Sequence, residues 1–325
     1  MANHDFSQDL SDLGVVVLSH NRIEEIRHTL PGLCQATKQL GFELIVVDNA
    51  STDGSQELLQ KYARKYPEVR LIQSRLNLGV GGGRNLGWKN CSRDYILNLD
   101  EDTRINLSHI RSMRDAIEAK PFVGVLFPEM VDHTSGRSLV GHGIKSPGNF
   151  HGACHIVRSA AIRSVGYLDP ACSFGGEELD YSIRLRAKGW EIEYEPRIVV
   201  SHNGLPRSSN VSLWRQTQWH ANYQRIVIRY FPIRMALRYS LRLLITHAMS
   251  GTSKHGFPFL PPFIRSAVDG YRAGLKYRTP VSRSVSTFYS ARDLRPDLGN
   301  VPLSLKLADK IRRSKPWKVA GENSG

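Results

Sequence analysis

The sequence is poor in cysteine and has no long hydrophobic run, and both features exclude classes of protein. Four cysteines occur among the 325 residues, far apart and without a CxxC pair or a Cys and His cluster at zinc spacing. We therefore expect neither a disulfide scaffold nor a structural zinc site, and a reducing cytosol is the simpler location. No uncharged apolar stretch reaches the roughly 18 residues that a membrane span needs. Asp5, Asp9 and Asp12 stand where a signal peptide would need positive charge, so no signal peptide is expected.

Acidic residues are missing from one long stretch of the chain. None occurs between Glu195 and Asp269, whereas residues 1–195 hold 25 Asp and Glu against 22 Lys and Arg. Residues 196–325 hold 22 Lys and Arg against 5 Asp and Glu, which accounts for the net charge of +14 of the whole chain. Such asymmetry predicts two regions with different roles. We place them at residues 1–205 and 206–325.

The rest of the composition is that of an ordinary globular protein, with 41% hydrophobic and 23% charged residues. In the first region short apolar β-rich runs alternate with helical stretches, which predicts an α/β fold with a mostly parallel central sheet flanked by helices. The second region has a helical pattern and forms a basic extension. The expected strands are Leu13–Ser19, Glu43–Val47, Val69–Gln73, Tyr95–Leu99, Glu191–Glu195 and Ile198–Val200, and the expected helices include Glu24–Gln39, Ser55–Tyr66, Arg84–Asn90, Ile156–Val165 and Glu177–Lys188.

Polar residues follow three of the expected strands directly. They are residues 20–22 after the first strand, Asp48 at the end of the second, and the acidic residues 100–102 after the fourth. Open α/β sheets bind ligands at the carboxyl ends of their strands. These loops are therefore the expected position of a binding site, although a local Asx-turn is an alternative role for Asp48.

The carboxylates of residues 100–102 are candidates for a metal site. Three carboxylates at a strand end repel one another unless a cation is present, and oxygen ligands select hard cations such as Mg²⁺ or Mn²⁺. The alternative is the acidic first turn of a helix. His202 follows another expected strand and is either a further metal ligand or an ordinary loop histidine.

A glycine-rich segment precedes the helix expected from Arg84. Gly79, Gly81, Gly82 and Gly83 allow a ligand to approach the backbone closely, and the Arg84 guanidinium suits a phosphate. The spacing fits neither a dinucleotide-binding fingerprint nor a P-loop. A turn without a ligand is the alternative.

Acidic residues also begin the helix expected at Glu177–Lys188. They are Glu177, Glu178 and Asp180, and one of these carboxylates would suit a general base that removes a proton from an incoming hydroxyl group. Acidic residues are common in the first turn of helices for structural reasons, so that alternative stays open.

The order of these motifs resembles that of the family 2 glycosyltransferases, which have a GT-A fold. The resemblance implies inverting transfer of a sugar from a nucleotide-diphosphate sugar to a hydroxyl acceptor, dependent on a divalent cation, Mg²⁺ or Mn²⁺. It leans toward rhamnosyl- or N-acetylhexosaminyl-transferring relatives. The segments that carry it lie between Leu13 and Asn203 and read LSHNR, VVDNASTDGS, NLGVGGGRNLGW, ILNLDEDT, HGACHIVRSAAIRSVGYLD, GGEELDYSIRLRAKGW and SHNG.

The resemblance also implies roles for single residues. Residues 100–102 correspond to the DxD motif, so Asp102 would hold the cation, Asp100 would share it or face the ribose, and His202 would be a further ligand. The GGEELD segment corresponds to the ED region, in which Glu178 would be the catalytic base and Asp180 the reserve candidate. The implied donor-binding residues are His20, Asn21, Arg22, Asp48, Asn77, Gly79, Gly82, Arg84, Asn85 and Asp100.

The basic second region has three interpretations. In the first, arginines beside Leu and Ile at helical spacing belong to helices that lie on an anionic membrane. In the second, the region binds an anionic soluble acceptor. In the third, the arginines are only the solvated surface of ordinary helices. We therefore expect the protein in the cytoplasm, either free or peripheral at the inner face of the cell membrane. The acceptor is a glycan, a lipid-linked molecule or a secondary metabolite.

Two other functions fit part of the sequence. One is binding of a nucleotide sugar without turnover. The other is binding of nucleic acid through the basic region, but no recognised nucleic-acid motif occurs and the first region is slightly acidic. We therefore expect no nucleic-acid partner.

Overall fold

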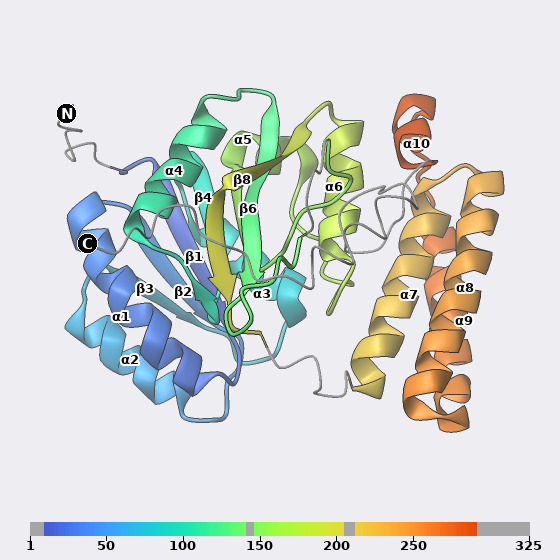
Figure 1. Cartoon of the computed structure of the whole chain (residues 1–325), viewed down its shortest axis with the longest axis horizontal. Helices are drawn as coiled ribbons and strands as arrows, with labels where there is room; N and C mark the ends of the chain where they lie inside the picture. Colours follow the sequence, from blue (N-terminus) through green and yellow to red (C-terminus); the bar gives the residue numbers. More distant parts are fainter. Residues whose placement is uncertain (1–9, 141–145, 205–211, 291–325) are drawn as a thin grey trace.

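The computed structural model of the chain describes residues 10–140, 146–204 and 212–290. The described residues up to 204 form an α/β unit, and residues 212–290 form a layer of helices beside it (Figure 1). The boundary predicted between residues 205 and 206 lies outside the described residues. Within the described part of the chain, no helix combines the length and apolar character that crossing a membrane requires.

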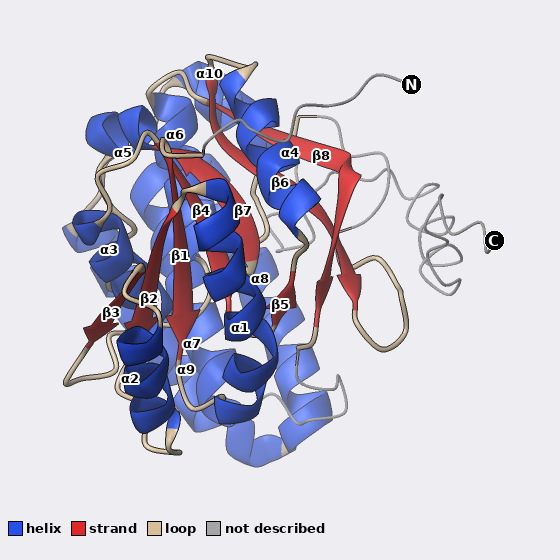
Figure 2. Cartoon of the chain, turned by 90° about the vertical axis from the view of Figure 1, so that its left-hand side faces the viewer, coloured by secondary structure: helices blue, strands red, loops and turns tan. Residues whose placement is uncertain are grey.

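A mixed sheet forms the centre of the α/β unit, and its strand order is β3-β2-β1-β4-β7-β6-β8-β5. β1 pairs in parallel with β2 and β4, β2 with β3, and β6 with β8 (Figure 2). β7 is antiparallel to β4 and β6, and β5 is antiparallel to β8. The strands are β1 (Leu13–Ser19), β2 (Glu43–Asp48), β3 (Val69–Gln73), β4 (Tyr95–Asp100), β5 (Thr103–Arg104), β6 (Val123–Asp132), β7 (Cys154–Arg158) and β8 (Glu191–His202).

Helices cover both faces of the sheet and form the second region. The hydrophobic side chains that face the sheet make one core with β1, β2, β4, β6 and β7. The helices are α1 (Ile23–Leu40), α2 (Ser55–Lys65), α3 (Gly79–Asn90), α4 (Leu107–Glu118), α5 (Ser159–Val165), α6 (Glu177–Ala187), α7 (Leu213–Tyr230), α8 (Ile233–His255), the short 3₁₀ turn η1 (Phe257–Phe259), α9 (Leu260–Lys276) and α10 (Arg283–Ser290).

The expected α/β architecture and the basic helical extension are confirmed, but three expected elements differ. The helix expected at Arg84 begins at Gly79, so the glycines are part of it. They are needed there for packing, because a Cβ at Gly83 would lie 2.5 Å from Leu18 and one at Gly87 2.3 Å from Val16.

The helix expected at Ile156–Val165 was wrong in its first half. Cys154–Arg158 is strand β7, which lies between β4 and β6, and the helix α5 begins only at Ser159. The side chains of β7 are almost all buried, so the strand carries no polar alternation that could distinguish it from a helix.

The two strands expected at Glu191–Glu195 and Ile198–Val200 are one strand, β8. The pairing with β6 shifts register between Pro128 and Glu129, and Pro196 falls in that irregularity. Proline is tolerated at an irregular position because no ladder hydrogen bond is needed from its nitrogen.

A second hydrophobic core joins the helical layer to the α/β unit. It contains Leu179 and Ile183 of α6 together with side chains of α7, α8 and α10, including Tyr223, Ile226 and Tyr289. The helix predicted to carry the catalytic base is therefore packed from both regions.

Candidate active site

The candidate site lies where β1, β2 and β4 end. Ser19, Asp48 and Asp100 are the last residues of these parallel strands, so their loops meet at one edge of the sheet. His202 reaches the same edge from the end of β8, because β5 pairs Thr103 with His202. The topology thus brings together residues that are a hundred positions apart in the sequence.

Asp100, Asp102 and His202 form a compact cluster. Each offers one ligand atom, and these atoms all lie within 4.8 Å of one another. Asp102 is almost completely buried, and its Oδ1 lies 3.0 Å from His202 Nε2. The three predicted metal ligands therefore lie close together. Two carboxylates and one imidazole are a donor set that fits Mg²⁺ or Mn²⁺.

The charges of the cluster depend on one another. Burial would raise the pKa of Asp102, but the hydrogen bond and positive charge of His202, with help from Arg22, lower it below its usual value. Burial opposes protonation of His202, yet the hydrogen bond and charge of Asp102 raise the pKa of His202. Each of the two residues therefore favours the charged form of the other.

A third carboxyl group, that of Glu101, lies beside the cluster. Burial, followed by the charges of Asp100 and Asp102, raises the pKa of Glu101 to about 8. Arg22 lies between the loops, with its NH2 3.4 Å from Asp102 Oδ2 and its Nε 3.9 Å from Glu101. The predicted donor residue Arg22 therefore contacts the acidic residues directly.

Glu178 is linked to the same cluster by a buried arginine. Arg84 donates from NH2 to Asp100 Oδ1 at 2.8 Å and to the Gly152 carbonyl at 2.9 Å, while its NH1 lies 3.4 Å from Glu178 Oε1. Burial raises the pKa of the Glu178 carboxyl and the positive charge of Arg84 opposes that rise. Arg84 thus bridges the predicted base and a predicted metal ligand.

Gly152 is a site residue that the sequence reasoning missed. A Cβ at this position would lie 2.0 Å from Glu178 Oε1 and 3.2 Å from Arg84 NH1. Only glycine leaves room for the Glu178 carboxylate there. The segment HGACH contains Gly152, but nothing in its sequence shows that a side chain from α6 would pass over it.

Asp180, the reserve base, does not face the cluster. It is completely buried, accepts from Arg184 Nε at 2.8 Å and from the Tyr230 hydroxyl at 2.8 Å, and lies 3.8 Å from Arg229 NH1. These contacts tie α6 to α7. The geometry therefore favours Glu178 over Asp180 as the group that meets an acceptor.

The predicted nucleoside side of the site is built around Asn49, a second residue that the sequence reasoning missed. Its side-chain amide donates to Asn77 Oδ1 and to the Gly79 carbonyl, each at 3.1 Å, and its oxygen accepts from Leu78 N at 2.9 Å. Asn77 is also within 3.1 Å of His20 Nε2. The position of Asn49 directly after Asp48 was the available signal.

Three polar atoms on this side have no hydrogen-bond partner within the described residues. They are Asp48 Oδ2, which is buried at the end of β2, Ser19 Oγ at the end of β1, and His20 Nδ1. Asp48 Oδ1 accepts from Ser51 N at 3.2 Å. An unpaired buried carboxylate oxygen is costly unless a ligand satisfies it.

The remaining predicted donor residues have mainly structural contacts. Asn21 accepts from Thr52 N at 2.7 Å, and Asn85 pairs with the backbone of Leu168 through two hydrogen bonds. A Cβ at Gly79 would lie 2.4 Å from Ser173 O, and one at Gly82 would lie 2.8 Å from Leu78. These residues shape the loop and helix that border the cluster.

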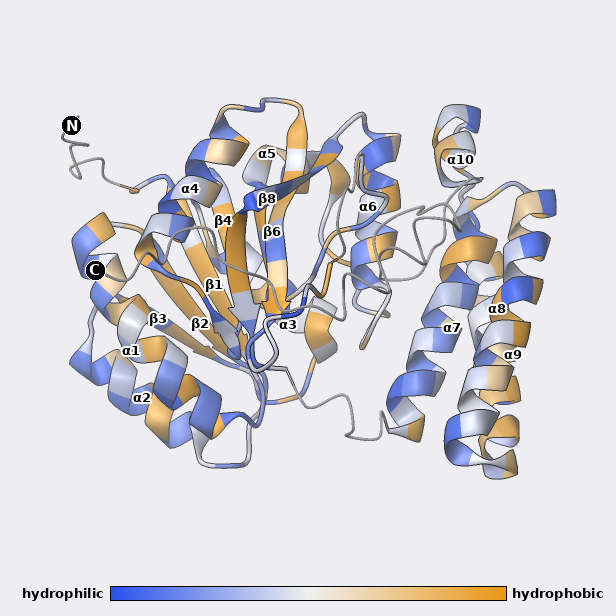
Figure 3. Ribbon diagram, viewed as in Figure 1, coloured by the Kyte–Doolittle hydropathy of each residue, from blue (hydrophilic) through white to orange (hydrophobic). Residues whose placement is uncertain are grey.

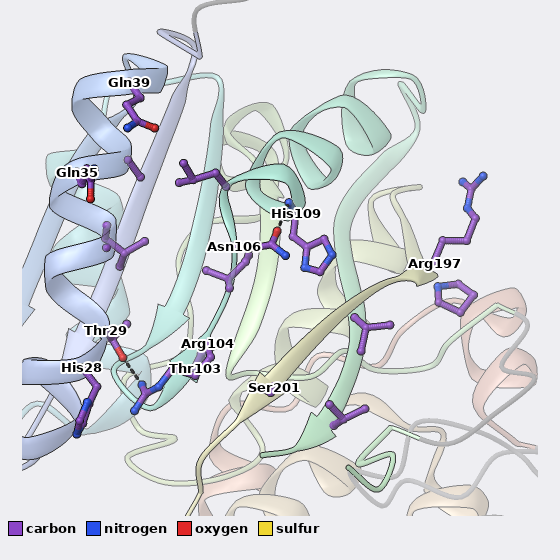
Figure 4. Close-up of a pocket in the computed structure, with 18 residues that line it drawn as sticks. His28, Thr29, Gln35, Gln39, Thr103, Arg104, Asn106, His109, Arg197 and Ser201 are labelled. Carbon is purple, nitrogen blue, oxygen red and sulfur yellow. Dashed lines mark hydrogen bonds between the residues drawn. The ribbon is translucent and has the colours of Figure 1, made fainter. Parts of the chain in front are cut away.

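A groove of about 1080 Å³ adjoins the cluster and was not expected from the sequence. Its walls come from α1, β5, the start of α4 and β8 (Figure 4). Thr103 and Ser201, which line it, are direct neighbours in sequence of Asp102 and His202. Polar residues such as Gln35, Asn106 and His109 face into it.

Comparison with other proteins places this architecture among known enzymes. Residues 14–145 match the family model described as "Glycosyl transferase family 2". The poly-beta-1,6-N-acetyl-D-glucosamine synthase of Staphylococcus aureus strain COL is 24% identical over 257 residues, which cover 73% of this chain and 61% of the relative. The enzyme of the same name from Staphylococcus epidermidis is 22% identical over 258 residues with the same coverage. The chain thus spans 61% of the length of these curated relatives.

Solved structures share the fold at low sequence identity. The S. aureus TarS fragment 1–349 in complex with UDP-GlcNAc has a TM-score of 0.57 at 18% identity and covers 86% of this chain and 85% of its own. The mannosyltransferase PcManGT from Pyrobaculum calidifontis in complex with GDP-Man and Mn²⁺ has a TM-score of 0.51 at 13% identity. The match covers 94% of this chain and 82% of the PcManGT chain. At these identities the likeness supports the fold alone.

The chain therefore has the fold of these glycosyltransferases of known structure. The part of the chain that matches the family 2 model, residues 14–145, includes Asp100 and Asp102 of the site.

Proposed function

We propose that the protein transfers a sugar from a nucleotide-diphosphate sugar to a hydroxyl acceptor by a single displacement with inversion. In this reaction the bond between the anomeric carbon and the diphosphate oxygen breaks while the acceptor oxygen bonds to that carbon. The acceptor's proton passes to Glu178. The observation that carries the proposal is the connection Asp100–Arg84–Glu178, in which one arginine contacts both a carboxylate of the metal-type cluster and the proposed base.

The cluster would hold a divalent cation, Mg²⁺ or Mn²⁺, through Asp100, Asp102 and His202. A bound cation supplies stabilisation of the negative charge on the diphosphate leaving group. The chain's own groups support the donor: Asp48 offers an unsatisfied buried oxygen to the nucleoside, and the Asn49–Asn77 pair fixes the loop that borders it.

Glu178 can act as a base because it is only partly buried, with 18% of its side chain exposed, whereas its neighbour Glu177 is buried. Arg84 favours the ionised form of Glu178, which is the form that accepts a proton. A positioned base of this type contributes about 10²–10⁴ in rate.

The donor is tested by thermal unfolding in the presence of nucleoside diphosphates and their sugars, with and without Mn²⁺. The panel includes UDP-GlcNAc and GDP-mannose, which the related structures contain. A ligand that binds the folded state raises the melting temperature by mass action. Asp102→Ala should abolish the part of this shift that requires Mn²⁺. If no nucleotide or sugar nucleotide changes the melting temperature in either condition, the proposed donor class is wrong.

The base is tested by comparing Glu178→Gln with Asp180→Asn. Glu178→Gln should keep the donor-dependent thermal shift and lose transfer by at least about a hundredfold. Asp180→Asn should lower the melting temperature without ligand, because it disturbs the buried contacts with Arg184 and Tyr230. Full turnover by Glu178→Gln would refute its assignment. Donor binding without any transfer or donor hydrolysis by the wild type would show a binding protein instead.

A further inference from the structure

The outer sides of α8 and α9 expose two rows of large apolar side chains. On α8 the row repeats every four residues, and its members are 50–69% exposed. On α9 a second row is 37–59% exposed, and Phe257 in the connecting turn is 79% exposed. The α8 row is Ile233, Leu237, Leu241, Ile245 and Met249, and the α9 row is Ile264, Val268, Tyr271 and Leu275. Figure 3 shows hydrophobic and hydrophilic segments alternating along both helices.

These rows are not the faces that hold the helices in the fold. α9 packs on α7 through small residues: a Cβ at Gly270 would lie 2.3 Å from the Ala221 carbonyl oxygen, and one at Gly274 would lie 2.7 Å from Ile228. The inner side of α8 buries Ala236, Tyr239 and Leu243. The helical layer is therefore packed mainly through other side chains, and much of the surface of the two outer rows is left exposed.

Basic residues flank both rows. Arg234, Arg238 and Arg242 follow the α8 row by one position each, and α9 carries Arg265, Arg272 and Lys276 beside its row. The one acidic residue among positions 212–290 is Asp269. Long arginine and lysine side chains can keep their charges at a lipid headgroup while their stems cover apolar surface.

We propose that the outer faces of α8 and α9 dock the protein on an anionic lipid surface. The apolar rows would enter the boundary between headgroups and acyl chains, and the arginines would contact the lipid phosphates. A second copy of the chain fits this surface poorly, because a symmetric dimer would bring the arginine rows of both copies together. Residues 291–325 also match it poorly, since they hold eight Lys and Arg against four Asp and Glu.

Docking there would place the catalytic helix one layer from the lipid. α7 contacts α8 and α9 on one side and the loop before α6 on the other. At that loop, Asn222 Nδ2 of α7 donates to the Gly175 carbonyl at 2.8 Å, and the rings of Trp214 and Phe174 lie 6.2 Å apart. The same α7 contacts Asp180 through Tyr230. Lipid contact is a property of the helical layer and does not depend on the proposed transferase reaction.

The test is sedimentation of the full chain with vesicles of phosphatidylcholine alone or with added phosphatidylglycerol. Binding is expected only with the anionic lipid and should weaken as salt rises. The double variant Leu241→Ser, Ile245→Ser should bind at least about tenfold more weakly. The double variant Arg234→Gln, Arg272→Gln should bind about thirtyfold more weakly, at ~1 kcal/mol per basic residue.

Matched controls change residues on the α/β unit that are also exposed. Leu76→Ser, Phe122→Ser replaces side chains that are 71% and 75% exposed, and Arg27→Gln, Arg163→Gln removes two exposed charges; both should bind like the wild type. An unchanged melting temperature shows that each variant is folded. The proposal is overturned if the wild type does not bind anionic vesicles, or if the control variants weaken binding as much as the α8 and α9 variants do. It is also overturned if the wild type is a dimer that Leu241→Ser, Ile245→Ser dissociates.

Discussion

At the scale of single residues, the site depends on how Arg84 divides its hydrogen bonds. It is 2% exposed and contacts Asp100, Glu178 and the Gly152 carbonyl. A buried arginine is retained only when its charge is compensated, and here the compensation comes from one group of the metal-type cluster and from the proposed base. A change at Arg84 therefore affects both groups.

The pH dependence of transfer follows from this contact. Glu178 must be ionised to accept a proton, so kcat/KM should fall as the pH decreases through its pKa, and because that pKa is raised the fall begins above 4.5. Arg84→Met removes the charge that lowers the pKa of Glu178 and should move this acid limb to higher pH. Arg70→Met, at an exposed arginine far from Glu178, is the control. An acid limb that does not move in Arg84→Met would contradict the role of Arg84.

Gly152→Ala tests the room that the base requires. The new Cβ would meet the end of the flexible Glu178 side chain, which can swing away at little cost to stability, so the melting temperature should change little. The displaced carboxylate should lower transfer about tenfold to a hundredfold, because small misplacements of a catalytic group are costly. Turnover and thermal unfolding of Gly152→Ala are measured beside Gly32→Ala, whose Cβ would meet nothing within 4 Å. Equal turnover in both variants would rule out the steric argument.

The sequence predicts the residues whose chemistry is local and misses those whose role is spatial. Asp100, Asp102 and His202 stand at or next to strand ends, where the sequence allowed either a cation site or ordinary structural roles, and the family resemblance favoured the cation site. Gly152 and Asn49 act on side chains and loops that approach from elsewhere in the chain. The role of Arg84 was assigned from the glycines beside it, whereas its partners come from β4 and α6.

At the scale of elements, the strands with clear boundaries were predictable and the packing-dependent ones were not. β1, β2, β3 and β4 are short apolar runs between polar loops, and the sequence places them correctly within about a residue. β7 and the first turn of α3 were assigned incorrectly, because burial on all sides and close helix-to-strand contacts leave no periodic signal.

The contact between α7 and α9 gives a prediction at this scale. Gly270→Ala puts a methyl group 2.3 Å from the Ala221 carbonyl oxygen, a backbone atom that cannot move alone, and should lower the free energy of unfolding by about 1–3 kcal/mol. Gly32→Ala, in the middle of α1, has open space and should raise it by about 0.5–1 kcal/mol. Urea unfolding of both variants measures the difference. A Gly270→Ala variant as stable as Gly32→Ala would show that the two helices are not in close contact.

At the scale of the whole molecule, the two regions predicted from charge share a core. The charge asymmetry at Glu195 marks a real change of surface, because the helices that follow carry the basic residues. The distribution of charge, however, predicts only surface properties and does not predict which buried side chains of α6 pack on α7. Leu179 and Ile183 of α6 belong to the core of the helical layer, and Asp180 takes partners from both sides.

A protein that ends at residue 204 tests whether the first region folds alone. Truncation would expose Leu179 and Ile183 to water and remove Tyr230 and Arg229 from the buried Asp180. Exposing apolar surface lowers the free energy of unfolding by roughly 25 cal/mol per Å². The loss of hydrogen-bonding and charged partners of the buried Asp180 carboxylate lowers it further. We therefore expect residues 1–204 to unfold without a sharp thermal transition and to bind a hydrophobic dye, whereas the full chain unfolds cooperatively. A cooperative transition near the melting temperature of the full chain, together with a donor-dependent shift, would instead show that the boundary predicted at residue 205 separates two independent domains.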